Sequence, residues 1–252
     1  MSFSLRQFDL PEMLRCGLDL RRIARPAEGM EAAAEAVVRY FHDIFVDPAS
    51  GERECALVRF YVTHPYGALP PELQAYARER MAGREPWSAM KCLVLLATAG
   101  REPAWNSRHL SRGHRAIPLP SVEIVEQAPM IAQLVRQMGL DLESVVSPQP
   151  ELLQGLQGKT YNVFYVPEAG GSHAIPAQDE FVRPYGIRSV LGCGGVHVTG
   201  ELYAAILFSR VPIPQESADR FRNIALDLKM AISAFREEHI FGDAAAPTPE
   251  PA

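Results

Sequence analysis

The sequence predicts an α+β fold, in which helices pack on a β-sheet, and three observations support this class. Several short runs are rich in β-branched and aromatic residues, as strands are, and two longer segments carry apolar residues at helical spacing. Clusters of Gly, Pro and polar residues separate these segments. With 252 residues, 47% of them hydrophobic, the chain is long enough to bury a substantial core.

Two long helices are expected, one early and one late in the chain. Residues 30–45 place five apolar side chains on one face of a helix: Met30, Ala34, Val37, Phe41 and Ile44. Pro214 can begin the last helix, whose apolar face contains Phe221, Ile224, Leu228, Ala231 and Phe235. A helix with a single apolar stripe needs a surface to pack on, and a sheet provides one.

Strands and shorter helices are expected between these long helices. The predicted strands are 55–62, 90–98, 161–166, 187–193 and 201–209. The shorter helices are expected at 69–81, after Ser121, from Pro129 to Gly139, and around 177–186. The stretch from Gly100 to Pro120 and the polar segment after Gly139 are expected to be irregular.

The segment that begins at Gly195 has the glycine spacing of a phosphate-binding loop, since Gly200 follows five residues later. Such a loop next requires Lys and then Ser or Thr, but Glu201 and Leu202 follow here. Glu201 would repel a phosphate, and the run after it is too rich in β-forming residues to be the required helix. The two apolar runs are therefore expected to form a β-hairpin turned by the glycines.

With this hairpin in place, the stretch 184–232 resembles the closing half of a GAF domain, a sensory domain of bacterial signal-transduction proteins. The matching pieces are the turn Gly186–Ser189, the two hairpin strands, the exit at Phe208–Ser209 and the helix from Pro214. The opening half is similar as well, with a helix at 30–45 and strands at 55–62 and 91–98. The resemblance covers about 30–240.

The resemblance implies a GAF/PAS-like α/β sandwich with a central antiparallel sheet. The terminal helices would pack on one face, and shorter helices and loops would cover a ligand pocket on the other. Two departures affect that pocket: 99–160 is longer than the usual middle segment, and Gly192-Cys193-Gly194 stands where members often carry an apolar residue followed by Pro.

The chain is expected to divide into three parts. An N-terminal extension, 1–28, precedes the GAF-like domain at 29–240, and a flexible linker or tail follows at 241–252. The extension could pack on the domain or continue as a dimer helix, and the sequence leaves both arrangements open.

Charge and cysteine content exclude several classes of function. A net charge of −5 gives no basic field to attract nucleic acid or an anionic membrane. The chain has neither a membrane-spanning apolar run nor a secretory signal, so a cytoplasmic location is expected. Four scattered cysteines form no CxxC pair and are expected to be buried and inert: Cys16, Cys55, Cys92 and Cys193.

A basic loop supplies most of the candidate ligand-binding residues. Arginine forks pair with carboxylate or phosphate, so the loop could bind an anionic or aromatic ligand. The alternative is a solvated loop matched by acidic groups elsewhere. No acid or Cys completes a metal set with its two histidines. The candidates in this loop are Trp105, Arg108, His109, His114 and Arg115.

Three further candidates lie beyond this loop: Phe164, His173 and Arg188. Phe164 and His173 flank a strand-to-helix loop, and the GAF resemblance places this loop near the pocket. Arg188 enters a strand and could clamp an acidic group of the ligand. The alternatives are ordinary polar loop contacts and an ion pair of Arg188 with Asp179 or Glu180.

Enzyme signatures are not found in the sequence. It contains no G-x-S-x-G, no H-E-x-x-H and no EF-hand loop. Within the GAF resemblance, the set of residues that marks cyclic-nucleotide binding is absent. No Cys is followed by His, as in bilin-carrying members, and the cysteines are not clustered, as they are in members that reduce free methionine sulfoxide.

The function expected from the resemblance is non-catalytic sensing of a small molecule within a signalling protein such as a two-component system. The cofactor is unknown. The expected partners are an unidentified ligand, a second copy of the chain that forms a homodimer through the terminal helices, and an output domain such as a histidine kinase or cyclase. Binding to nucleic acid or to a membrane is not expected. The alternatives are a pocket enzyme using Cys or His, a ligand-free dimerisation scaffold, and a haem sensor that uses His64, His109 or His173.

Overall fold

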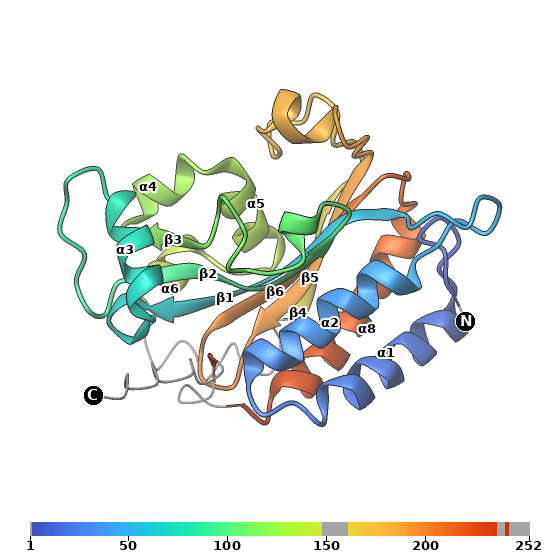
Figure 1. The fold of residues 1–252 in the computed structure, drawn as a ribbon, viewed down its shortest axis with the longest axis horizontal. Helices are drawn as coiled ribbons and strands as arrows, with labels where there is room; N and C mark the ends of the chain where they lie inside the picture. The colour runs from blue at the N-terminus through green and yellow to red at the C-terminus, as the bar shows by residue number, and fades with distance from the viewer. Residues whose placement is uncertain (1, 148–160, 236–239, 242–252) are drawn as a thin grey trace, which may run out of the picture.

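A six-stranded antiparallel sheet forms the centre of the protein (Figure 1), in a computed structural model that describes residues 2–147, 161–235 and 240–241. The strand order is β3-β2-β1-β6-β5-β4, with every neighbouring pair antiparallel. The strands are β1 Cys55–Pro65, β2 Lys91–Gly100, β3 Ala116–Leu119, β4 Tyr161–Val166, β5 Ser189–Val196 and β6 Leu202–Ser209. The expected α+β fold with a central antiparallel sheet is confirmed.

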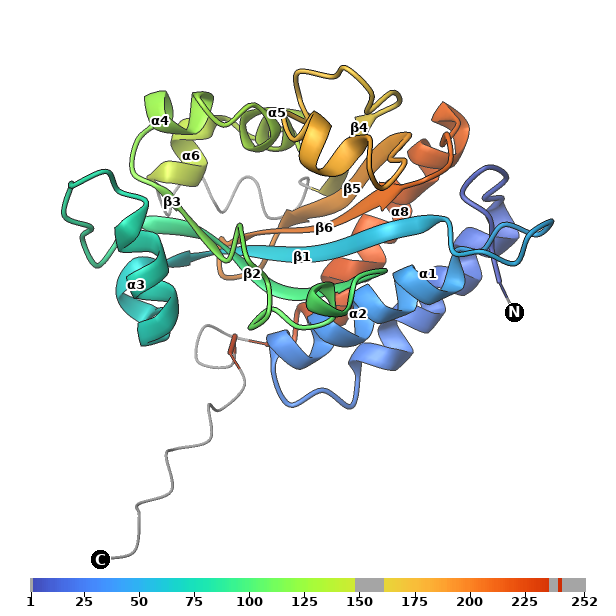
Figure 2. The same ribbon diagram turned by 45° about the horizontal axis from the view of Figure 1, so that its top comes forward.

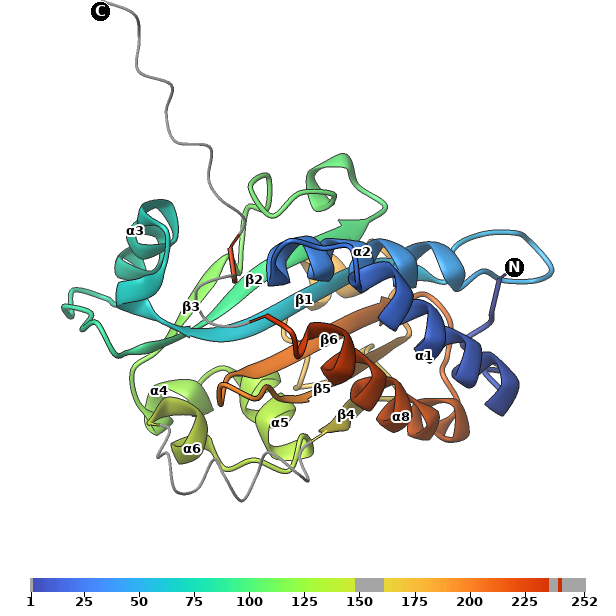
Figure 3. The same cartoon turned by 90° about the horizontal axis from the view of Figure 1, so that it is seen from below.

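Three long helices cover one face of the sheet. They are α1 Leu10–Ala24, α2 Met30–Ile44 and α8 Gln215–Ile232. Figure 3 shows them lying in front of the sheet, with α1 beside α8. The short helix α3, Pro71–Glu79, packs at the other end of the same face through Leu73 and Tyr76. Both predicted long helices are therefore confirmed, and Pro214 does occupy the N-cap of the last one.

Shorter elements cover the opposite face. They are α4 Val122–Glu126, α5 Pro129–Gln137, α6 Leu142–Val146 and a π-helical turn at Gln178–Val182. Figure 2 shows the sheet between these elements and the long helices. Ser121 caps α4 by accepting the N–H of Ile124, as its position before the helix suggested.

The N-terminal residues pack on the same core as the rest of the chain. Asp9 caps α1 through a reciprocal pair of hydrogen bonds with Glu12. The ring of Phe8 lies 5.2 Å from that of Phe221 on α8, centroid to centroid. Residues 2–28 therefore lie against α2 and α8, which answers the question that the sequence left open about this segment.

Helices α1 and α8 approach each other closely at Gly17. A Cβ atom added at Gly17 would lie 1.9 Å from Oδ2 of Asp227. Arg21, one turn along α1, forms an ion pair with the same carboxylate at 3.3 Å. The absent side chain at Gly17 thus makes room for the acidic group that joins the two helices.

The hairpin predicted at 187–209 is confirmed. Strands β5 and β6 pair from Ser189 opposite Ser209 to Val196 opposite Leu202. The turn closes with the N–H of His197 donating to the carbonyl of Glu201 at 2.8 Å. The buried Glu201 carboxylate pairs with Lys91 at 2.7 Å and so neutralises a lysine.

One strand and one α-helix in the described part of the chain were not predicted. Strand β3 lies within the stretch expected to be irregular, and α6 lies within the expected polar loop. Both are only four or five residues long, so neither shows enough periodicity to stand out in the sequence. Residues 148–160 and 242–252, which include most of the expected tail, lie outside the described residues.

None of the helices in the described part of the chain is long and apolar enough to cross a membrane.

Close packing explains one glycine of Gly192-Cys193-Gly194, the segment in which the sequence departs from the GAF pattern. A Cβ atom at Gly194 would lie 2.1 Å from the carbonyl oxygen of Tyr203, whereas one at Gly192 would lie 3.3 Å from the nearest atom of Phe164. We expect Gly194→Ala to lower the free energy of unfolding by about 2–3 kcal/mol, because strand backbones would have to separate. Urea denaturation measures this change.

Gly192→Ala is the matched control, because the same methyl group is added two residues away on the same strand. It should change the free energy of unfolding by less than about 1 kcal/mol. Equal effects of the two substitutions would show that the close approach of the Tyr203 backbone is not the reason why position 194 is a glycine.

Candidate functional site

A polar pocket opens at one end of the sheet, beside the C-terminal half of α2. Its volume is about 510 Å³, which lies in the range of small-molecule sites. The residues that line this arginine pocket are Arg39, His42, Asp43, Glu52, Arg53, Cys55, Ala99, Gly100, Arg101, Asn106 and Arg210.

Strand pairing brings three of these arginines to the same end of the sheet. Arg53 precedes β1, while Arg101 follows β2 and Arg210 follows β6. Because β2 and β6 both run antiparallel to β1, their C-terminal ends meet where β1 begins. The backbone N–H groups of Arg101 and Arg210 donate to the carbonyls of Ala56 and Glu54 respectively. The two arginines therefore flank β1 on opposite sides.

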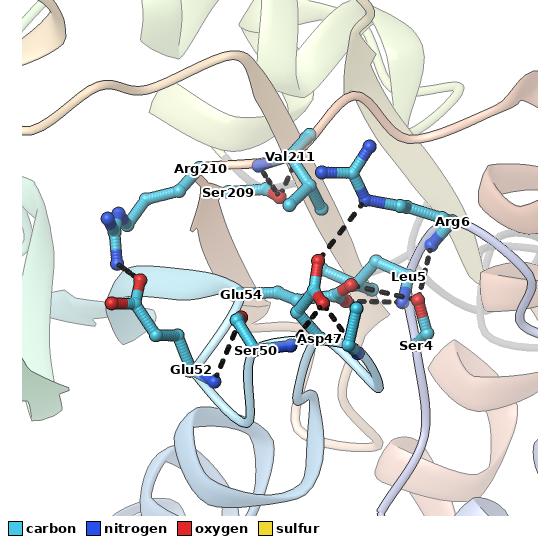
Figure 4. A network of polar contacts seen from close by, with 11 residues as sticks. Ser4, Leu5, Arg6, Asp47, Ser50, Glu52, Glu54, Ser209, Arg210 and Val211 are labelled. Atoms are coloured by element: carbon cyan, nitrogen blue, oxygen red, sulfur yellow. Dashed lines mark hydrogen bonds and ion pairs between the residues drawn. The ribbon is translucent and has the colours of Figure 1, made fainter.

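Three of the four arginines already have acidic partners. These pairs lie at the surface, where solvent screens them, so each contributes at most about 1 kcal/mol and is easily exchanged. Figure 4 shows one of them, between Arg210 and Glu52. The pairs are Arg39–Glu35 at 2.5 Å, Arg53–Asp43 at 2.8 Å and Arg210–Glu52 at 3.2 Å.

Arg101 differs from the other three arginines. Within the described residues no acidic group lies within 4 Å of its guanidinium, and the side chain is exposed. Next to it, the Asn106 side chain holds the loop in place by bonding to both the N–H and the carbonyl of Gly100. The pocket thus presents one uncompensated guanidinium on a fixed backbone.

Two buried groups form the inner wall of the pocket. Burial, together with the positive charge of Arg53, lowers the pKa of His42. Burial also raises the pKa of the Cys55 thiol. Both groups are therefore held in their neutral forms, and the charge of the pocket comes from its arginines and acids.

The N-terminal segment is attached beside this pocket by the buried carboxylate of Glu54. The hydroxyl of Ser4 donates to one oxygen at 2.8 Å, and the N–H of Leu5 donates to the other at 2.6 Å. Figure 4 shows these bonds next to the Arg6–Asp47 ion pair, which spans 3.9 Å. Glu54 is 1% exposed, and its desolvation raises the pKa of the carboxyl group.

The aromatic candidates pack on the hydrophobic cluster beneath α4, α5 and α6, on the face of the sheet opposite the three long helices. Trp105 contacts Tyr185 and Phe181, with ring centroids 4.5 and 5.8 Å away, and Phe181 in turn contacts Phe208. Phe164 is fully buried in the same hydrophobic cluster. The face on which the GAF resemblance placed a pocket is thus packed with side chains around these candidates.

Arg108 lies on the other side of the sheet, at the start of α2. It forms a two-pronged ion pair with Glu31, and a second carboxylate, that of Glu72, lies 3.8 Å away. Only 8% of Arg108 is exposed. The structure therefore gives this arginine a structural ion pair, in line with the alternative that its charge is matched by acidic groups elsewhere.

The remaining candidates are spread over the surface. His109, His173 and Arg188 are exposed. Of the two acids considered as partners of Arg188, Asp179 and Glu180, the first pairs with Arg183 instead. The guanidinium of Arg115 lies 5.7 Å from the centroid of the Tyr76 ring. The residue before it, His114, has a positive φ of 61°.

The structure thus does not bring the eight predicted residues together, and none of them lines the arginine pocket. Their role in ligand binding stays a prediction. Among the residues described, no group of three His, Cys, Asp or Glu side chains is placed to hold a metal ion. His64, considered for haem, is buried and packs edge-on against Phe241.

The pocket arginines were missed because they are far apart in the sequence and no motif joins them. A usable signal was present: Arg53, Arg101 and Arg210 each lie next to the end of a predicted strand. Knowing that these strands are antiparallel neighbours would have placed all three at one end of the sheet. That pairing is a property of the tertiary fold, and only the β5–β6 hairpin could be inferred from local sequence.

Comparison with solved structures gives matches of low identity. The chain is similar to free methionine-R-sulfoxide reductase from Neisseria meningitidis, solved with its substrate, at 11% identity and a TM-score of 0.47, covering 94% of this chain and 99% of that one. It is also similar to a phycoerythrobilin-bound GAF domain of a cyanobacterial phytochrome, at 12% identity, a TM-score of 0.43 and coverages of 88% and 94%.

A third match is the GAF domain of a phosphoenolpyruvate-protein phosphotransferase from Coxiella burnetii, at 10% identity, a TM-score of 0.43 and coverages of 88% and 93%. No protein-family model matches the sequence, and no curated protein matches it significantly. The central antiparallel sheet with helices on its two faces is the arrangement expected from the sequence, and the matches carry nothing about a ligand.

The Glu54 carboxylate yields a pH-dependent prediction. Because its pKa is raised above the usual 4.5, the folded protein holds a proton that the unfolded chain releases. The stability that Glu54 contributes is therefore complete below pH 4.5 and declines as pH rises through the raised pKa. Glu54→Gln removes the charge, while its amide oxygen can still accept the N–H of Leu5 and its NH2 group can donate to the Ser4 hydroxyl. Its stability relative to the wild type should therefore increase from pH 4 to pH 7.

Chemical denaturation at several pH values measures this difference. Glu54→Ala is the control: it removes both bonds and should cost about 2 kcal/mol at neutral pH. A difference between the wild type and Glu54→Gln that does not vary with pH would contradict the raised pKa.

Proposed function

We propose that this chain is a non-catalytic sensory module that binds a small molecule in the arginine pocket. The observation that carries this proposal is the position of α2. Its C-terminal half supplies Arg39, His42 and Asp43 to the pocket, while its inner face packs on the sheet and on α1. A ligand held by these side chains would contact the helical layer directly. It would act through its different affinities for two arrangements of that layer.

The N-terminal end of α2 supports a route from the pocket to the C-terminal part of the chain. The N–H of Glu31 donates to the carbonyl of Ile240 at 2.9 Å, and Ile240 is buried. Phe241 lies between the ring of His64 and the guanidinium of Arg108, which itself pairs with Glu31. Movement of α2 would thus be transmitted to the segment that follows α8, where an output domain would be joined.

The cysteines support a role without catalysis. All four are buried. Burial raises the pKa of Cys92 and of Cys193 to about 12, and it raises the pKa of Cys16 and Cys55 further. A thiol nucleophile acts as the thiolate, so none of the four is prepared for chemistry at neutral pH.

A second copy of the chain is proposed as the partner on the α1–α8 surface. Leu10, Leu14 and Leu18 lie on successive turns of α1 and are 56–60% exposed. On the adjacent α8, Leu226 and Met230 are 38% and 56% exposed. These five residues form an apolar strip on two helices that pack together, and two such strips would bury each other in a symmetric dimer.

The ligand-binding proposal is tested by a small-molecule screen on the wild type and on an Arg53→Ala/Arg101→Ala variant. At least one compound should raise the melting temperature of the wild type but not of the variant, because both arginines line the pocket. The same compound should alter hydrogen exchange in α2 and α1. Compounds that act equally on both proteins, or that leave the helices unchanged, would contradict the proposal and favour a ligand-free scaffold.

The dimer is tested with Leu18→Glu, which places a charge in the apolar strip. The wild type should have the mass of a dimer by light scattering, and the variant should shift to a monomer because a buried charge is costly. Leu110→Glu is the matched control, since Leu110 is equally exposed but lies in a distant loop. A monomeric wild type, or a dimer unaffected by Leu18→Glu, would exclude this surface.

A further inference from the structure

We infer that the arginine pocket takes a small dianion, a molecule with two negative charges on carboxylate or phosphate oxygens. This inference rests on the proposed function and adds to it the chemical class of the ligand. It follows from three properties of the pocket: the charge of its walls, the separation of its arginines and its exposure to water.

The pocket is lined by more positive than negative side chains, although the chain as a whole is negatively charged. Four guanidinium groups and two carboxylates line it, while the chain as a whole carries a net charge of −5. Glu35 compensates Arg39 from outside the pocket, which leaves Arg101 as the uncompensated cation. A neutral or cationic ligand would leave that guanidinium without a partner, whereas an oxyanion matches its planar fork.

The positions of the arginines favour two anionic groups over one. Arg101 and Arg210 lie on opposite sides of β1, so their backbones are separated by two strand spacings, about 10 Å. Arg53 lies between them, at the start of β1. A ligand with two oxyanion groups can bind Arg101 with one and displace Glu52 or Asp43 from Arg210 or Arg53 with the other. A single carboxylate reaches only one side.

The acidic partners are suited to such displacement. The side chains of Glu52 and Asp43 are 66% and 58% exposed, so they return to water without a large desolvation cost when a ligand replaces them. The backbone beneath is fixed by the β1 pairing and by Asn106, so the ligand pays little to order the site. The volume of about 510 Å³ accommodates a metabolite-sized molecule.

Isothermal titration calorimetry at constant ionic strength tests the inference with three probes: succinate, inorganic phosphate and acetate. Succinate, whose two carboxylates can reach both sides of β1, should bind at least about tenfold more tightly than inorganic phosphate or acetate, each of which carries a single anionic group. Equal binding of all three, as expected for simple screening of a basic patch, would overturn the inference.

Substitutions at Arg101 locate the binding. Arg101→Ala should weaken the tighter dianion at least about tenfold, and Arg101→Lys, which keeps the charge but loses the fork, should weaken it less. Arg136→Ala is the matched control, an exposed arginine that pairs with a single glutamate, Glu126, on the other face of the sheet. It should leave the affinity unchanged. Equal loss in Arg136→Ala and Arg101→Ala would overturn the inference.

The failure of this inference can be separated from failure of the proposed function. If no dianion binds but another compound from the screen loses its effect in Arg53→Ala/Arg101→Ala, the pocket binds a ligand of a different class and only the inference is wrong. If neither dianions nor screened compounds depend on the pocket arginines, both are wrong.

Discussion

Burial of both faces of the sheet is the constraint on which the rest of this structure depends. Every residue of β5 and β6 is buried, as are nearly all those of β1 and β2. Two hydrophobic clusters, one on each face, follow from this. A sheet that is apolar on both sides needs two covering layers, and the side chains of those layers occupy the space over its middle. Polar groups are then left to the ends of the strands, where the arginine pocket lies.

The sequence predicted the elements of the fold well because each long element contains its own signal. The apolar faces of α2 and α8, the proline before α8 and the glycine turn between β5 and β6 are all local patterns. Short elements such as β3 lacked one. The sequence did not predict the arginine pocket, because its strongest local signal is a cluster of basic residues within one loop, whose role in ligand binding stays a prediction. In the fold, that loop crosses the edge of the sheet, and its members lie on different sides: Trp105 packs on one face and Arg108 pairs with α2 on the other.

Ion pairs serve two different purposes in this chain. Arg108 with Glu31 and Lys91 with Glu201 are largely removed from water and hold loops against the sheet. Loss of one partner there would strand a buried charge, which is expensive. The pairs around the arginine pocket are exposed and contribute little to stability. Exchangeable pairs of this kind are compatible with ligand binding, because their partners can be replaced without destabilising the fold.

The close contact between Gly17 and Asp227 has an evolutionary consequence. A side chain at 17 would push the Asp227 carboxylate away from Arg21, and a smaller residue at 227 would leave Arg21 without its acid. The two positions are therefore coupled, because the ion pair between the helices depends on both. Among relatives that keep α1 against α8, glycine and aspartate should be gained and lost together. Co-variation of this pair would mark the sequences in which both helices move as one unit.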